Sequence, residues 1–371
     1  MLEFLSLKEE AFGLDISDSS LKIAKLKGKE KPFDLVSFGE AEIGPGIIKD
    51  GEVQKENDLT KIIKEALSKT KEGKLKTKCV IASLPEEKAF LEVIQMPKLK
   101  PEELKDAVLL GAENYIPLPP EDVYLDFQIV EPLLDHLDHT DVLIAALPRK
   151  IVDPYVESIK KAGLQLRALE IESLSIARAL VKNETSSSPI LIVDFGANKT
   201  SFVIFSGHSV RFTSSVPISS QAITNDIAKE LNLPSKEAEV LKIKIGLEKE
   251  ISPGKTLKAI SSVLDSLVTE IEKCLGYYQG HIFHEHLPAG SKGINKILLS
   301  GGGVNLKGLP EFLTMATRLP VETGSPWINI LEAPIKKIPP LPYEKSLAFT
   351  TALGLALRGL REAQKAPHKN D

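Results

Sequence analysis

The feature of this sequence that most limits its fold is one pattern that occurs twice, about 180 residues apart. Each copy is an apolar strand that ends in an aspartate, then a short polar turn, then a second apolar strand. The first copy runs over 12–26 with Asp15 at the strand end, and the second runs over 191–205 with Asp194. One such segment predicts only a β-hairpin. A pair at this distance favours two similarly built halves.

Composition narrows the class of protein. A chain of 371 residues with 42% hydrophobic and 26% charged residues is typical of a globular protein with several domains. The formal net charge of −4 argues against a dedicated nucleic-acid binder. Cys79 and Cys274 lie far apart in apolar stretches, which suits a reducing cytoplasm. No apolar run approaches the roughly 18 residues that span a bilayer, so we expect membrane contact only through partners.

The remaining patterns predict a mixed α/β chain. Helical spacing predicts helices over 59–69, 102–114, 154–161, 173–182, 221–246 with a break near Pro234, 257–278, and a largely apolar closing helix over 346–360. Strands are predicted over 79–84, 124–130, 141–147, 166–171 and 296–300. The Ser-rich segment 183–189 predicts a linker between the two halves.

The two turns and a third, Gly-rich turn have the composition of a nucleotide site. Turns rich in Gly, Ser and Thr present backbone N–H groups and hydroxyls to phosphate oxygens. Asp15 and Asp194 can hold Mg²⁺, mostly through its water shell. Gly301-Gly302-Gly303 follows a strand and allows a flat ring close to the backbone; the alternative is an ordinary tight turn. The sequence contains no Gly-x-x-x-x-Gly-Lys-[Ser/Thr] motif, which excludes a P-loop.

In this order and spacing, the three elements resemble the phosphate-one, phosphate-two and adenosine motifs of the actin superfamily. The segment 238–242 resembles the helix whose Glu and Lys contact ribose and adenine in bacterial actins; the alternative is a solvated charge pair. The resemblance implies ATP with Mg²⁺ as ligands and Asp15 and Asp194 as metal residues. The nucleotide-binding residues that it implies are Ser17, Ser19, Ser20, Lys22, Gly196, Ala197, Asn198, Lys199, Thr200, Glu239, Lys242, Gly301, Gly302, Gly303 and Val304.

Further segments resemble the PilM family of type IV pilus assembly proteins over nearly the whole chain. They are 94–99, 113–119, 126–128, 145–148, 161–164, 170–179, 224–228, 237–239 and 354–358. This resemblance implies a cytoplasmic scaffold, peripheral at the inner face of the cytoplasmic membrane. It implies that the chain grips the N-terminal cytoplasmic peptide of PilN in a groove between subdomains IA and IC. It also implies a link from the inner-membrane complex to the pilus motor ATPases.

The fold expected is α/β: an actin-like, ribonuclease H-like duplicated two-domain fold with an inserted IC subdomain in the first half. The expected boundaries are 1–77 plus 151–188 for subdomain IA and 78–150 for the inserted subdomain IC. The second half is 189–344, comprising IIA with a helical IIB insertion at about 222–295, followed by a closing helix over 345–361 and a flexible tail over 362–371.

Two other functions stay open at this stage. One is an FtsA-like, filament-forming division or cytoskeletal protein, although the polar end of the chain does not predict FtsA's membrane-binding helix. The other is an active ATPase or phosphotransferase. Its candidate catalytic residue is Glu172, which lies where some bacterial actins carry a water-orienting Glu; the alternative is an acid favoured by a helix N-terminus. Ser17 and Asp18 depart from the usual first turn of relatives, and the charge of Asp18 near phosphates would weaken nucleotide binding unless it points outward or joins the metal site.

Overall fold

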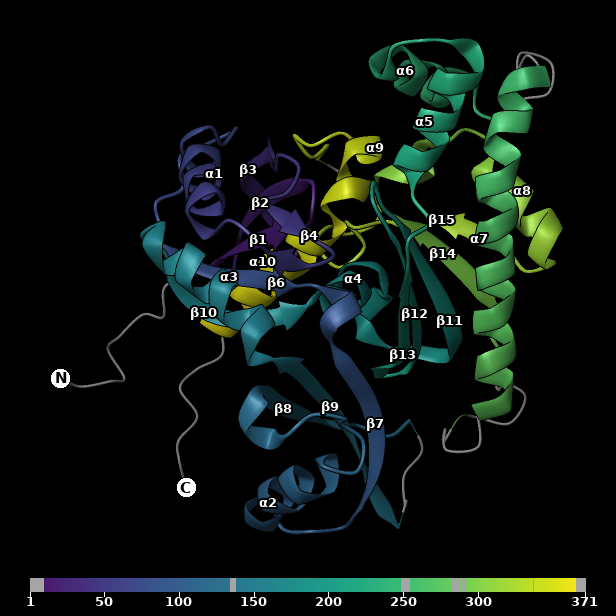
Figure 1. The fold of residues 1–371 in the computed structure, drawn as a ribbon. Helices are drawn as coiled ribbons and strands as arrows, with labels where there is room; N and C mark the ends of the chain where they lie inside the picture. The colour runs from purple at the N-terminus through teal and green to yellow at the C-terminus, as the bar shows by residue number, and fades with distance from the viewer. Residues whose placement is uncertain are drawn as a thin grey trace.

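The computed structural model describes residues 10–133, 138–247, 254–281, 287, 291, 293–335 and 337–364. Its framework is a pair of five-stranded sheets (Figure 1). The first sheet has the order β10-β6-β1-β2-β3 and consists of β1 (Phe12–Ile16), β2 (Ser20–Lys27), β3 (Asp34–Glu42), β6 (Cys79–Leu84) and β10 (Gln165–Ile171). The second has the order β13-β12-β11-β14-β15 and consists of β11 (Ser186–Phe195), β12 (Thr200–Gly207), β13 (Ser209–Val216), β14 (Lys296–Ser300) and β15 (Val321–Thr323).

The two sheets have the same topology, as the repeated pattern predicts. In each, three antiparallel strands come first and two parallel strands follow on the far side of the first strand. The turns match as well: Ser17 N donates to Ser20 O at 2.9 Å, and Gly196 N donates to Lys199 O at 2.9 Å. Both aspartates therefore stand at equivalent strand ends.

A third, three-stranded sheet lies apart from the other two (Figure 1). It has the order β7-β9-β8, from β7 (Phe90–Pro97), β8 (Val123–Val130) and β9 (His139–Pro148), and α2 (Pro101–Ala112) packs on it. The expectation of an inserted unit over 78–150 placed its start too early. The fully buried strand β6 pairs in parallel with β1 and β10, so it belongs to the first sheet. The inserted sheet also contacts the second half, where Arg211 Nη1 lies 3.3 Å from Asp141 Oδ2.

Each half has its own helices, which pack against its sheet. The first half carries α1 (Glu56–Ser68), α3 (Arg149–Lys161) and α4 (Glu172–Leu180). Between β13 and β14, the second half carries α5 (Ser220–Leu231), α6 (Ser235–Ile245) and α7 (Gly254–His281), and α8 (Leu309–Thr317) follows β14. None of the helices within the described residues is long and apolar enough to cross a membrane.

The Ser-rich segment 183–189 is not the free linker that its composition predicts. Strand β11 already begins at Ser186, which pairs with Gly207 of β12. Ser186 Oγ also donates a hydrogen bond to Ser188 O. Serine hydroxyls can satisfy local backbone groups, so a Ser-rich run is compatible with an ordered strand.

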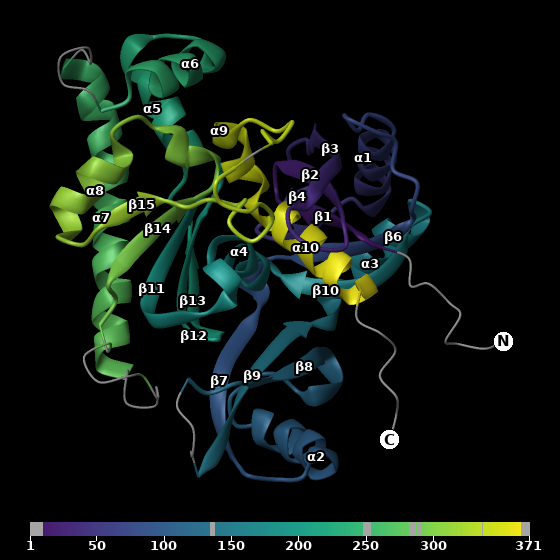
Figure 2. The same cartoon turned by 180° about the vertical axis from the view of Figure 1, so that it is seen from behind.

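The last helix, α10 (Thr350–Gln364), lies between β1 and α4 (Figure 2). It starts four residues later than the predicted helix over 346–360, after the short α9 (Tyr343–Ser346) and a 3₁₀ turn over 347–349. It also includes 362–364, which were expected in the tail, because Glu362 pairs with Arg358 and Gln364 Nε2 donates to Gly28 O at 2.7 Å. Residues 365–371 lie outside the described residues.

Two glycines set how closely α10 approaches its neighbours. A Cβ on Gly13 of β1 would stand 2.3 Å from Ala352 O, and one on Gly354 would stand 2.0 Å from Ser175 O. Both contacts are with backbone, which cannot give way without moving an element. The helix is buried from Thr350 to Leu360 except at Arg358. Its apolar side chains form one hydrophobic core with those of β2 and β3 in the first half.

We predict that Gly354→Ala destabilises the fold by at least ~3 kcal/mol, because its methyl group overlaps the backbone of α4. Urea unfolding measures the change. The matched control is Gly276→Ala on α7, where no atom lies within 4 Å of the added Cβ. That variant should be neutral or stabilised by up to ~1 kcal/mol through helix propensity. Equal stability of the two variants would contradict the packing described for α10.

Candidate functional site

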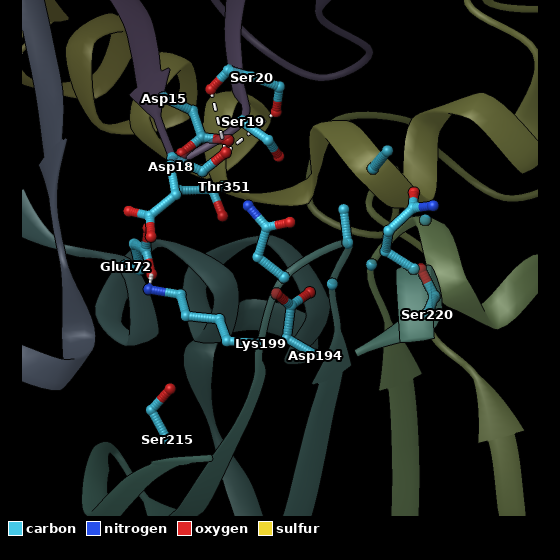
Figure 3. Close-up of a pocket in the computed structure, with 18 of the residues that line it drawn as sticks. Asp15, Asp18, Ser19, Ser20, Glu172, Asp194, Lys199, Ser215, Ser220 and Thr351 are labelled. Carbon is cyan, nitrogen blue, oxygen red and sulfur yellow. Dashed lines mark hydrogen bonds and ion pairs between the residues drawn. The ribbon is translucent and has the colours of Figure 1, made fainter. Parts of the chain in front are cut away.

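A cleft of about 670 Å³ lies between the two halves and is lined by both repeated turns. Figure 3 shows Asp15, Asp18, Ser19 and Ser20 on one side of it and Asp194 and Lys199 on the other. The cleft is the direct result of the duplication: each turn follows the first strand of its sheet, and the two sheets present these strand ends to each other. Its volume suits a ligand of nucleotide size.

Each aspartate is held by a serine position of the adjacent parallel strand. Ser83 Oγ of β6 donates to Asp15 Oδ1 at 3.1 Å and accepts a hydrogen bond from Ile16 N at 2.9 Å. In the second half, Asp194 pairs in register with Ser300 of β14. The sequence analysis assigned no role to Ser83, although its place at the end of a buried strand equals that of Ser300.

The electrostatics of the aspartates favour a cation. Burial raises the pKa of Asp15, with Lys22 opposing the shift from 3.9 Å. Burial also raises the pKa of Asp194, and the negative charge of Asp15 adds to the effect. A divalent cation would relieve this mutual repulsion. Among the described residues, no three His, Cys, Asp or Glu side chains gather as a metal site. Two carboxylates that face one cleft can hold Mg²⁺ that keeps most of its water shell.

Lys199 reaches from the second turn to two carboxylates of the first half. Its Nζ pairs with Glu172 at 2.9 Å and with Glu87 (Figure 3). Burial opposes the charge on Lys199, but the carboxylates of Glu172 and Glu87 raise its pKa above the usual range. Lys199 therefore carries its proton and joins the two halves across the cleft.

Glu172, the candidate catalytic residue, lies in this cleft at the first position of α4 and is buried. Its pKa is raised to about 8, chiefly by burial; Lys199 opposes the rise, and the nearby charges of Asp15 and Glu87 add to it. Glu172 and Glu87 thus share the ammonium group of Lys199, while Lys22 lies 3.9 Å from Asp15.

Asp18 lines the cleft, but its carboxylate is bonded to backbone N–H groups of a neighbouring turn. Its carboxylate accepts hydrogen bonds from Asp50 N at 2.9 Å and Gly51 N at 3.0 Å, in the turn between β4 (Ile48–Lys49) and β5 (Glu52–Val53). Two amide donors stabilise the charge of a carboxylate. The departure from relatives therefore gives the first turn a support, and Ser17, Ser19 and Ser20 remain at the cleft.

In the Gly-rich turn, Gly301 and Gly303 are required by close packing, and Gly301 and Gly302 line the cleft. A Cβ on Gly301 would stand 2.5 Å from Phe195 O, and one on Gly303 would stand 2.6 Å from the Phe195 ring. At Gly302 the nearest atom would be Ala348 Cβ at 3.6 Å, an ordinary contact. Gly301 and Gly302 line the cleft. The sequence predicts that a flat ring can lie close to the backbone of this turn, and Gly302 is the position where this would occur.

Only one residue of the predicted Glu–Lys pair of α6 lines the cleft, namely Glu239. Lys242 Nζ forms an ion pair with Glu239 Oε2 at 2.7 Å. Lys242 is buried, and its Nζ donates to Ser220 O at 3.2 Å and Thr224 Oγ1 at 2.9 Å. Lys242 therefore positions Glu239 instead of facing the cleft itself.

The cleft brings together most of the residues proposed from the sequence. Those that line it are Asp15, Ser17, Ser19, Ser20, Lys22, Glu172, Asp194, Gly196, Ala197, Asn198, Lys199, Glu239, Gly301 and Gly302. Thr200, Lys242, Gly303 and Val304 do not line it. Thr200 Oγ1 donates to Ile218 O at 2.6 Å, and Val304 packs in the core of the second half.

Lining residues that the sequence analysis missed come mostly from segments without a distinctive pattern. They include Asp50, Glu87, Lys88, Ser215, Val216, Pro217, Ser220, Gln221, Leu347, Ala348, Thr350 and Thr351. Only the charged run after the strand over 79–84 offered a signal, since polar residues at the end of a parallel strand often face a site.

A family model described as type IV pilus assembly protein PilM matches residues 13–360. Among solved structures, the chain is similar to one titled PilM-PilN type IV pilus biogenesis complex, with 28% identity, a TM-score of 0.76, and coverage of 95% of this chain and 99% of that chain. Two more distant structures share the fold. The ethanolamine utilization protein EutJ from Carboxydothermus hydrogenoformans has 15% identity and a TM-score of 0.55, with 94% of this chain and 90% of that chain covered. MreB 5 of Spiroplasma citri bound to AMPPNP has 12% identity and a TM-score of 0.52, with 94% and 95% covered.

Curated relatives match over shorter stretches. Cell division protein FtsA of Pseudomonas aeruginosa is 25% identical over 228 residues, 55% of this chain and 50% of that protein. FtsA of Neisseria meningitidis is 27% identical over 183 residues, 45% of this chain and 44% of that protein. The chain thus spans about half the length of these relatives or less. Together with the solved structures, these matches confirm the actin-like fold predicted from the sequence.

The raised pKa of Glu172 predicts how stability depends on pH. From its ordinary value of 4.5 to the folded value of about 8, the folded state holds a proton that the unfolded chain releases. Stability from this group is therefore full below pH 4.5 and is lost as the pH rises through 8. Glu172→Gln should remove the loss, so the variant gains at least ~1 kcal/mol on wild type between pH 5.5 and 8.5 in urea unfolding. Glu65→Gln, exposed on α1, is the control; parallel pH profiles of wild type and Glu172→Gln would contradict the assignment.

Proposed function

This chain belongs to the family of type IV pilus assembly protein PilM, and we propose that it is an ATP-binding scaffold of the pilus assembly machinery. The observation that carries the proposal is the cleft between two equivalent Asp-ended turns. We place the protein in the cytoplasm, peripheral at the inner face of the membrane and held there by its partners. Its three sheets would correspond to subdomain IA, the second half, and subdomain IC, which we now begin at Phe90.

ATP with Mg²⁺ fits the side chains of the cleft. The turn over 17–20 and the turn over 196–199 would hold the phosphates with backbone N–H groups, hydroxyls and the ammonium groups of Lys22 and Lys199. Asp15 and Asp194 would hold the water shell of Mg²⁺, which supplies charge neutralisation for the polyphosphate. Glu239, Gly301 and Gly302 lie in the same cleft and would receive the nucleoside.

We propose that any hydrolysis is slow. A residue that orients an attacking water must be free to accept its hydrogen bond. Glu172 is paired with Lys199 at 2.9 Å, so its carboxylate is already engaged in this arrangement. ATP would then act mainly as a structural ligand that sets how the two halves close.

The partner we propose is the N-terminal cytoplasmic peptide of PilN, since a solved relative with 28% identity over 95% of this chain is titled a PilM-PilN complex. The junction of α3 and the inserted sheet offers an exposed aromatic anchor. Tyr124 of β8 is 44% exposed, its hydroxyl donates to Asp153 at 3.0 Å, and the Arg149 guanidinium lies 4.2 Å from its ring centroid. Aromatic anchors carry much of the binding energy in peptide recognition. Through PilN, the scaffold would connect the inner-membrane complex to the pilus motor ATPases.

The nucleotide part of the proposal predicts that Asp194→Asn weakens Mg-ATP binding at least tenfold, about 1.4 kcal/mol. The cause is the loss of one of the two charges that hold the hydrated cation. Isothermal titration calorimetry measures the affinity, and Asp265→Asn, exposed on α7, controls for a general change of charge. Unchanged affinity in Asp194→Asn would remove this residue from the metal site.

The partner proposal predicts that a synthetic N-terminal PilN peptide from the same genome binds the whole chain with micromolar or better affinity, about −8 kcal/mol. Tyr124→Ala should weaken this binding at least tenfold. Tyr115→Ala is the matched control, since Tyr115 is 52% exposed on the same inserted unit but lies after α2. Absence of binding with and without Mg-ATP would refute the scaffold proposal and favour the filament-forming alternative.

A further inference from the structure

The turn Glu86–Lys88 joins three parts of the molecule through three successive side chains. Glu86 Oε2 accepts a hydrogen bond from Ser173 N, at the start of α4, at 3.1 Å. Glu87 pairs with Lys199 of the second half, and Lys88 Nζ pairs with Glu52 of β5 at 2.9 Å. A short turn is thus tied to a helix, to the opposite half and to a hairpin at once.

The same turn is a covalent link to the inserted sheet. It follows β6 of the first sheet and leads within two residues into β7 of the inserted sheet. The second link, from β9, enters α3 directly after Pro148. Any change in the position of Glu86–Lys88 is therefore passed to the start of β7.

One buried polar atom of the turn forms no hydrogen bond within the described residues. Glu86 is only 4% exposed, and within the described part of the chain its Oε1 has no hydrogen-bond partner. A buried carboxylate oxygen without a donor costs free energy. Gly51 lets the β4–β5 turn pack closely against this segment, because a Cβ there would stand 2.7 Å from Pro85 Cβ and 2.9 Å from Glu87 Oε1. The arrangement thus depends on the Glu87–Lys199 contact more than a fully bonded turn would.

Phosphate oxygens of a nucleotide would be a second kind of anionic partner for Lys199. It belongs to the second of the two proposed phosphate-binding turns and lines the cleft, so its ammonium group would be near a bound polyphosphate (Figure 3). Phosphate oxygens and carboxylates compete for the same donors of a lysine.

We propose that Lys199 is a switch residue that exchanges Glu87 for a phosphate of the bound nucleotide, releasing the Glu86–Lys88 turn and so reporting occupancy of the cleft to the inserted sheet. The proposal rests on the proposed function, because it takes the nucleotide site as given and adds its regulation. It assigns Glu87 the role of a competitor of phosphate. The contact that holds the turn is then the one that ligand binding must break.

The direction in which one variant changes the affinity for Mg-ATP distinguishes this role from a structural one. Glu87→Gln removes the competitor, so Mg-ATP should bind at least threefold tighter than in wild type. A merely structural contact, once lost, would leave affinity unchanged or weaker. Glu52→Gln is the matched control: it removes the same charge beside the same turn but touches Lys88 instead of Lys199. Equal tightening in both variants would mean a general electrostatic effect and would overturn the proposal.

Hydrogen exchange of the full-length chain gives the second readout. In wild type, Mg-ATP should speed exchange over 85–92, while adenosine, which has no phosphate, should not. In Glu87→Gln this segment should exchange fast already and respond little to Mg-ATP. If wild type binds Mg-ATP without a change over 85–92, the switch is refuted and the nucleotide site stands. If wild type binds no Mg-ATP, both are refuted.

Discussion

Two aspartates at equivalent strand ends, Asp15 buried and Asp194 half-buried, are the constraint on which the site depends. Each carboxylate is fixed by the next parallel strand, Asp15 through Ser83 and Asp194 opposite Ser300. Because both lie in low-dielectric surroundings and face one cleft, each makes ionisation of the other more costly. The lysines Lys22 and Lys199 offset part of this charge, and a hydrated cation would offset more. The ion pair of Lys199 with Glu172 and Glu87 links the two halves across this cleft.

The repeated pattern predicts both the fold and the larger part of the cleft, since strand alternation, polar turns and the position of an Asp are local properties of the chain. The family model and the 28% identical solved structure confirm that interpretation for the fold and family. The role of the site residues stays a prediction. Lys242 and Gly303 show why the local sequence pattern is not sufficient. Their positions in the sequence are those of ligand residues, but in the structure Lys242 pairs with Glu239 and Gly303 packs against Phe195.

The residues that the sequence could not assign are those whose role depends on contacts between distant elements. Glu87 belongs to a charged run that is typical of any exposed turn, and only its contact with Lys199, 112 residues away, gives it meaning. The strand β6 was assigned to the inserted unit because nothing in six apolar residues tells which sheet they join. Asp18 is the converse case, where a residue that looked unfavourable is stabilised by the backbone of a hairpin more than 30 residues later.

The contact between Arg211 and Asp141 has a mechanical consequence. It ties the inserted sheet to the second half, while the chain itself ties that sheet to the first half and α10 packs against the first half from the other side. The three bodies therefore form a closed linkage, in which no pair can rotate freely without the third. A two-body hinge opens along one axis with little resistance, whereas a closed linkage restricts motion to paths on which all joints move together. In such a frame, a load applied to the inserted sheet would be felt at the cleft as a torque between the two halves.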